Sequence, residues 1–159
     1  MGQSLKLAAI FVGVVLAQLN LAQYLRVGAI RPDFILVFLV FISARYGRMA
    51  GIAVGFSAGL LQDLTGSLSV LGANTLAKSV LGYTLGTLNG TLTVWTPRIV
   101  NVYIYGALLG HAVVYQTIMS LGLQLSPGLL ANHILLETFS SSVMVTATRY
   151  MLPLMPGQA

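Results

Sequence analysis

The chain has 159 residues, of which 57% are apolar and only 7% are charged. A soluble domain carries about a quarter charged residues, and a small soluble core could not bury this much apolar sequence. The composition therefore excludes an ordinary soluble domain. It predicts an all-α integral membrane protein with a single domain over residues 1–159.

The net charge of +5 is spread along the chain, and there are no cysteines. Disulfides, thiol catalysis and cysteine metal sites are thereby excluded. No basic cluster or aromatic platform suggests nucleic-acid binding. The N-terminal apolar run lacks the pattern of a removable signal, so we expect it to be the first span.

A spanning helix needs about 20 apolar residues. Leu7 to Leu25 meets this requirement. Phe34 to Ala44 has only 11 residues, or roughly 17 Å of helix, so it borrows its flanks or thins the bilayer locally. Met49 to Leu64 is the third predicted helix. One helix from Phe34 to Leu61 is disfavoured because it would place two arginines inside a span, at several kcal/mol.

Three further helices are predicted, at Leu68 to about Leu92, Ile99 to Leu123, and Leu129 to Leu152. Trp95-Thr96-Pro97 and Ser126-Pro127-Gly128 interrupt the apolar pattern between them. The sequence thus predicts six transmembrane helices with short loops. Continuous apolar runs argue against a membrane barrel, whose strands would alternate.

Orientation follows the number of lysines and arginines in short loops. With the N-terminus inside, five positive residues lie on the cytoplasmic side and two outside. The cytoplasmic set is Lys6, Arg45, Arg48, Arg98 and Arg149, and the outer set is Arg26 and Arg31. We therefore expect both termini in the cytoplasm.

Small and polar residues recur every four positions in two predicted helices. The third helix carries Gly47, Gly51, Gly55, Gly59 and Asp63, and the fourth carries Asn74, Lys78, Gly82, Gly86 and Gly90. In lipid, glycine lets two helix backbones approach closely. Two interpretations stay open: the rows pack against a helix of the same chain, or part of a row docks another protein's span.

Asp63 lies at the predicted outer end of the third helix. Its carboxylate either orders the following turn through backbone N–H groups or forms a ligand or proton site. Arg31-Pro32-Asp33 precedes the second helix, where proline and aspartate suit a first turn. Arg31 then anchors the topology or pairs with an aspartate on the same side.

Lys78 and Glu137 have matching predicted depths of about 15 Å, which favours an intramembrane ion pair between the fourth and sixth helices. His133 lies one turn from Glu137 on the same face, and His111 is near the middle of the fifth helix. With Asn74, the two histidines could line a pocket. Two interpretations stay open: these polar residues form either a structural network or a functional one.

No enzyme motif is present. Two histidines and three carboxylates show no metal-ligand spacing, and neither a nucleophile elbow nor a phosphate loop occurs. We expect a protein that is not an enzyme and that needs no cofactor.

Arg31-Pro32-Asp33 before a short apolar helix, then Gly55-Phe56 and Gly59 to Leu64 with Gly66 and Gly72, resembles the bacterial rod shape-determining protein MreD family. These motifs cover about residues 31 to 86, and the remainder matches in hydropathy. Carried over by position, the signature residues are Arg31, Pro32, Asp33, Gly59, Asp63 and Gly66.

The resemblance implies a fold like the six-helix substrate-binding component of energy-coupling vitamin transporters. It also implies an inner-membrane scaffold or regulator of peptidoglycan synthesis during cell elongation, without catalysis of its own. The implied partners are an MreC-like single-span scaffold, an MreB-like filament protein, and RodA with its transpeptidase. A vitamin-binding transporter component is the alternative, and a proton-coupled transporter using Glu137 and His111 is a weaker one.

Overall fold

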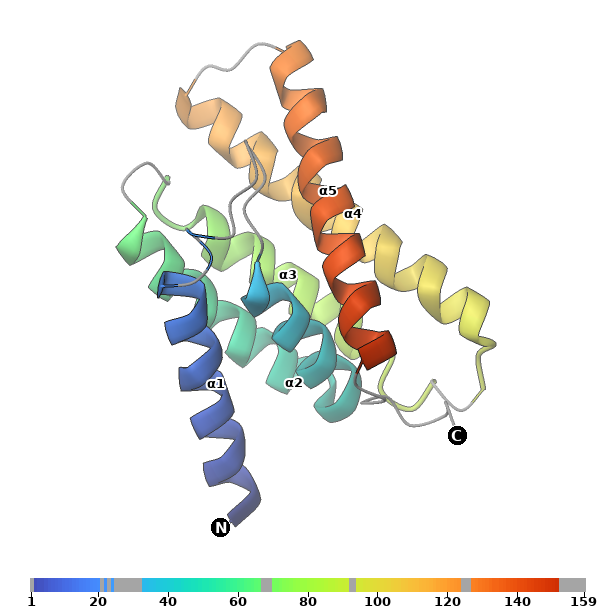
Figure 1. Ribbon diagram of the computed structural model, residues 1–159. Helices are drawn as coiled ribbons and strands as arrows, with labels where there is room; N and C mark the ends of the chain where they lie inside the picture. Colours follow the sequence, from blue (N-terminus) through green and yellow to red (C-terminus); the bar gives the residue numbers. More distant parts are fainter. Residues whose placement is uncertain are drawn as a thin grey trace.

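The computed structural model describes residues 2–20, 22, 24, 33–66, 70–91, 94–123 and 127–151. Within these residues the chain forms five α-helices and no strand, which confirms the all-helical class. The helices are α1 (Gly2–Asn20), α2 (Phe34–Thr65), α3 (Ala73–Gly86), α4 (Pro97–Leu123) and α5 (Pro127–Met151), shown in Figure 1.

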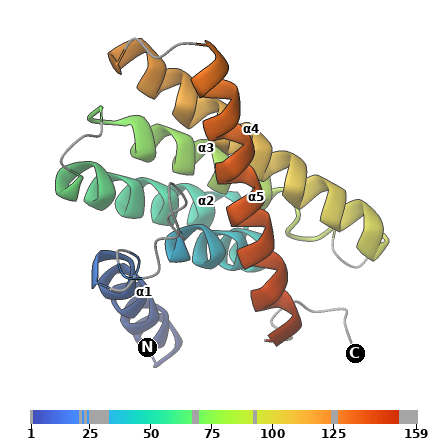
Figure 2. The same cartoon turned by 45° about the horizontal axis from the view of Figure 1, so that its top comes forward.

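The helix α2 is sharply broken at Gly47, where φ is 84° and ψ is −172°. Glycine adopts this conformation readily because it has no Cβ. In a straight helix Ser43 and Gly51 would lie about 12 Å apart along the axis. Instead, Ser43 Oγ lies 2.6 Å from the position of a Cβ built on Gly51. The two halves of α2 therefore fold back beside each other, as Figure 2 shows.

The structure has five helical elements where six helices were predicted, because the predicted second and third helices follow each other directly at this break. The expected second and third helices are the two halves of one element, and the chain reverses at Gly47 without an intervening loop. Arg45 and Arg48 flank the break and are exposed. A single straight helix from Phe34 to Leu61, which the sequence disfavoured, is not observed either. The two arginines therefore do not lie inside one straight span.

The predicted fourth helix is too long at both ends. Its counterpart α3 has 14 residues, or about 21 Å. It starts after Gly72, whose φ of 95° cannot belong to a right-handed helix, and turns follow Gly86. The helices α4 and α5 each begin two residues before the predicted start, at Pro97 and Pro127, because proline suits a first turn. The predicted end of the first helix lies outside the described residues.

The core lies where α2, α3, α4 and α5 meet. Its members include Leu36, Leu39, Leu81, Leu85, Leu88, Ile104, Leu108 and Val145. The outward faces are also apolar and include Val102, Leu135 and Phe139, all exposed. Such faces suit lipid or another membrane helix rather than water. By length and composition alone, two stretches qualify as candidate spans: Phe34–Thr65, which the break at Gly47 divides, and Pro97–Leu121 of α4.

Candidate functional site

The two glycine rows meet along α2 and α3, which run in opposite directions. A Cβ on Gly51 would overlap the backbone carbonyl of Gly82, and a Cβ on Gly55 would overlap that of Lys78. These obstacles are backbone atoms, so no rotation of a side chain could relieve the overlap. The rows therefore hold the two helices in direct backbone contact.

The contact continues toward both ends of α3. A Cβ on Gly59 would lie 2.6 Å from the carbonyl oxygen of Asn74, and one on Gly86 would overlap the backbone of Arg48. Two predicted packing residues behave differently. Gly47 forms the break in α2, and Gly90, with φ 87°, has open space around it.

Of the two open interpretations, packing within the chain is the one observed for the middle of each row. The backbone of α3 occupies the space beside Gly51, Gly55 and Gly59. These three positions leave no room for a helix of another protein.

Asp63, near the end of α2, binds the N-terminus of α3. Its two carboxylate oxygens accept five hydrogen bonds, from the backbone N–H groups of Gly72, Asn74 and Thr75 and from the side chains of the last two, at 2.6–3.1 Å. The first N–H groups of a helix have no partner within it. Since Gly72 cannot cap α3 with a side chain, Asp63 supplies the cap from α2 and complements the helix dipole.

A second carboxylate, Asp33, caps α2 itself. Its Oδ1 accepts hydrogen bonds from the N–H groups of Ile35 and Leu36, at 3.0 and 3.2 Å. Gln18 of α1 accepts the hydrogen bond of the Phe34 N–H at 2.7 Å. The remaining carboxylate oxygen, Oδ2, lies 2.7 Å from Nζ of Lys78.

The prediction that Lys78 pairs with Glu137 is wrong, because Lys78 binds Asp33 instead. The depth comparison assumed that the fourth helix starts at Leu68. The helix starts at Ala73, so Lys78 lies nearer to the end at which α2 begins. Burial by itself would raise the pKa of Asp33, but the nearby ammonium and the hydrogen bonds hold that pKa below its usual 3.8.

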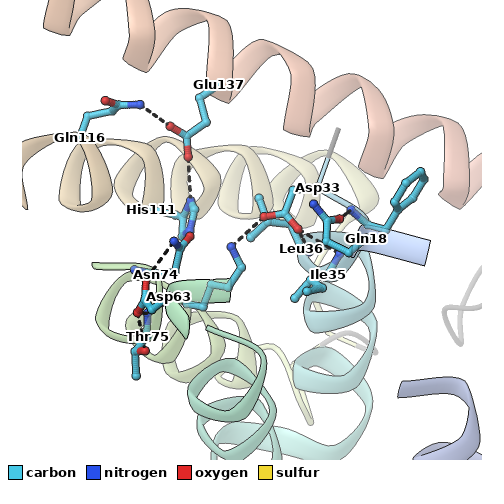
Figure 3. Close-up of polar contacts among 12 residues, drawn as sticks. Gln18, Asp33, Ile35, Leu36, Asp63, Asn74, Thr75, His111, Gln116 and Glu137 are labelled. Carbon is cyan, nitrogen blue, oxygen red and sulfur yellow. Dashed lines mark hydrogen bonds and ion pairs between the residues drawn. The ribbon is translucent and has the colours of Figure 1, made fainter. Parts of the chain in front are cut away.

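Glu137 belongs to a different group, between α4 and α5. Its Oε2 accepts a hydrogen bond from Gln116 Nε2 at 2.8 Å, and its Oε1 lies 3.6 Å from His111 Nδ1. Figure 3 shows Glu137 above His111, with Asn74 and Asp63 below the imidazole ring. Asp33 and Lys78 also act electrostatically on both His111 and Glu137. We call these four residues the polar cluster, in which α2, α3, α4 and α5 meet.

The other predicted residues are scattered. Asn74 joins the Asp63 cap, and Gly66 ends α2 with its N–H bonded to the Gln62 carbonyl. His133 is exposed and does not join the polar cluster with His111. Arg31 and Pro32 lie outside the described residues.

Sequence reasoning missed a pair of small residues on α4. Gly106 and Gly110 are exposed, and a Cβ on either would meet nothing within 4 Å. Val102, Leu109 and Val113 lie beside them and are exposed as well. We call these five residues the α4 outer face. The spacing Gly-x-x-x-Gly in an apolar helix was the signal that could have identified it.

No three histidine, aspartate or glutamate side chains converge as metal ligands in the part of the chain that the structure describes. The polar cluster joins helices, because each of its carboxylates contacts a group on another helix. Buried ion pairs, glycine-packed helices and apolar outer faces define the class as a helical membrane protein.

Comparison with known families gives the particular family. The chain belongs to the rod shape-determining protein MreD family, whose model matches residues 2–155. This confirms the resemblance seen in residues 31 to 86 and extends it over nearly the whole chain. No curated protein and no solved structure matches, so the expected likeness to vitamin-transporter components stays a prediction.

Proposed function

We propose that this chain is a non-enzymatic scaffold or regulator of peptidoglycan synthesis in the bacterial inner membrane. Membership of a rod shape-determining family supports a role in cell shape. The three described carboxylates, Asp33, Asp63 and Glu137, bond to groups on neighbouring helices, which suits a structural role for these residues in a protein that acts by binding others. The proposed direct partner is an MreC-like protein with one membrane span, and an MreB-like filament protein and RodA with its transpeptidase complete the assembly.

The α4 outer face is the proposed docking surface for that span. In lipid, apolar surface alone drives little association, and close backbone approach at small residues supplies the contact. Gly106 and Gly110 offer such an approach one helical turn apart, and their space is open. The packed glycines of α2 and α3 cannot serve, because the backbone of the other helix already occupies their space: Gly51, Gly55, Gly59, Gly82 and Gly86.

The proposed topology has six helical segments crossing the membrane, if the two halves of α2 are counted separately. Asn89, in the turn after α3, donates a hydrogen bond to the carbonyl of Arg45 at 2.7 Å. Arg48 lies beside Gly86 at the end of α3. Positive residues thus gather at the end of the molecule where α2 breaks, which supports placing this end, and both termini, in the cytoplasm.

Partner capture in membranes tests the docking surface. Gly106→Leu and Gly110→Leu should each reduce the amount of MreC-like protein that co-purifies with the full chain, and cells should lose their rod shape. Gly13→Leu is the matched control, because Gly13 also lies in a helix with nothing within 4 Å. Undiminished capture by both α4 variants, at normal protein levels, would reject the α4 outer face.

The control for folding is Gly55→Leu. Because Gly55 packs on the backbone of α3, this change should lower the amount of folded protein itself. A loss of capture with a normal amount of folded protein is thereby assigned to docking and not to misfolding.

A further inference from the structure

The buried imidazole of His111 and the partly buried carboxylate of Glu137 form a pair between α4 and α5. The His111 side chain is 2% exposed and that of Glu137 is 23% exposed. The other imidazole nitrogen, Nε2, is fully buried without a hydrogen-bond partner among the described residues. At 3.6 Å the pair is close enough for a strong interaction between charges in a medium of low dielectric constant.

The charges that face this pair come from neighbouring helices. Asp33 at the start of α2 and Lys78 of α3 both act on it, but they neutralise each other at 2.7 Å. Asp63, also of α2, is bound by the N-terminus of α3. In the described part of the chain, Glu137 therefore has no cation of its own unless His111 is protonated.

The remaining titratable groups do not supply that charge. Tyr115 of α4 stacks on the His111 ring with a centroid distance of 6.4 Å, and a neutral phenol brings no positive charge. Gln116 of α4 is a neutral hydrogen-bond donor to Glu137. His133, one turn before Glu137 on α5, is exposed.

We propose that His111 and Glu137 together bind one proton at neutral pH, and that this proton ties α5 to α4. The proton lies either on His111, which gives an imidazolium–carboxylate pair, or on Glu137, which gives a neutral acid beside a neutral imidazole. Both arrangements avoid an ionised, partly buried carboxylate without a counter-charge beside a buried imidazole, which is disfavoured in a medium of low dielectric constant. The ligand of this site is a proton taken from the aqueous phase.

The sign of the pH effect follows from proton counting. In an unfolded chain, glutamate and histidine lose their protons near pH 4.3 and 6.5, so from about pH 8 the two groups together hold almost none. The folded pair holds one. Since the folded state binds more protons, its stability must fall as the pH rises above neutrality.

A direct test uses the intact protein in lipid vesicles. Glu137 is the single glutamate of the chain, so cell-free synthesis with glutamate that carries 13C only at the side-chain carboxyl labels this group for infrared spectroscopy. Histidine with 15N in the ring, incorporated into the His133→Gln variant, reports the imidazole of His111 by NMR. We expect at neutral pH either a protonated Glu137 or an imidazolium at His111. An ionised Glu137 beside a neutral His111 would overturn the proposal.

Variants assign the effect to the pair. Between about pH 6 and pH 9, the melting temperature of the wild-type chain should fall, as the proton is lost from the folded state. Glu137→Gln should flatten this dependence, because a neutral amide needs no counter-charge. His133→Gln, the matched control at the other histidine, should retain it. A pH dependence of Glu137→Gln equal to that of the wild type would contradict the proposal.

Discussion

Replacing Gly51 by alanine tests whether backbone contact between α2 and α3 holds the fold together. The added Cβ would overlap the carbonyl of Gly82, so the two helices would have to separate by about 1 Å to restore an ordinary contact. A gap of this size loses a quarter to a half of the dispersion energy at each neighbouring contact. Overpacking of a tight core costs about 1–3 kcal/mol, and alanine regains up to about 1 kcal/mol through helix propensity. We expect a net loss of about 1 kcal/mol in the free energy of unfolding.

The assay is reversible unfolding in mixed micelles, with Gly106→Ala as the matched control. A Cβ on Gly106 meets nothing within 4 Å, so this variant should gain up to about 1 kcal/mol from helix propensity alone. The gain in helix propensity is common to both variants and cancels in their comparison, so the two proteins should differ by the overpacking cost of about 2 kcal/mol. Equal stability of the two proteins would refute the reasoning that the glycine rows are needed for close packing.

Three further predictions concern the polar contacts. Asp63→Asn should destabilise the protein by about 2 kcal/mol in the same unfolding assay, because it weakens the charged hydrogen bonds that cap α3. A stability within about 0.5 kcal/mol of the wild type would argue against the cap. Lys78→Met and Asp33→Asn should each lower the free energy of unfolding. The double variant should lose less than the sum of the two single losses, by about 1–3 kcal/mol in a double-mutant cycle. Additive losses would exclude the pair. The lowered pKa of Asp33 means that the contribution of this pair is present at neutral pH and is lost as the pH falls through that lowered value. Gln18→Ala should speed amide hydrogen exchange at Phe34, whose N–H loses its acceptor, and unchanged exchange would show that α1 does not cap α2.

The four-residue spacing of small residues predicted close helix packing, because periodicity places such residues on one helix face. It could not say which helix each row would meet. That choice depends on how far the chain reverses at Gly47, and a single positive φ decides it. The arginines on either side of Gly47 indicated that a straight span could not continue there, but they did not distinguish a loop from a break within one element.

The position of Asp63 at a helix end was predicted, and the acceptance of backbone N–H groups was one of its two interpretations. The partner of Lys78 was not predictable by counting residues from estimated boundaries. An error of five residues in the start of α3, Ala73 against Leu68, shifts a side chain by about 7.5 Å along the helix. Such a shift is larger than the length of an ion pair, so partners at similar estimated depths cannot be distinguished.

The central proposal, that the α4 outer face docks the span of an MreC-like partner, is tested most directly by cross-linking. The chain has no cysteine, so Val113→Cys on α4 and Leu16→Cys on α1 each introduce a single thiol at an exposed position. Each variant is expressed with a partner whose span carries cysteines one at a time, and membranes are oxidised before purification. The proposal predicts a disulfide to the partner's span from Val113→Cys and none from Leu16→Cys. Cross-linking from Leu16→Cys alone, while the partner still co-purifies with both variants, would contradict it.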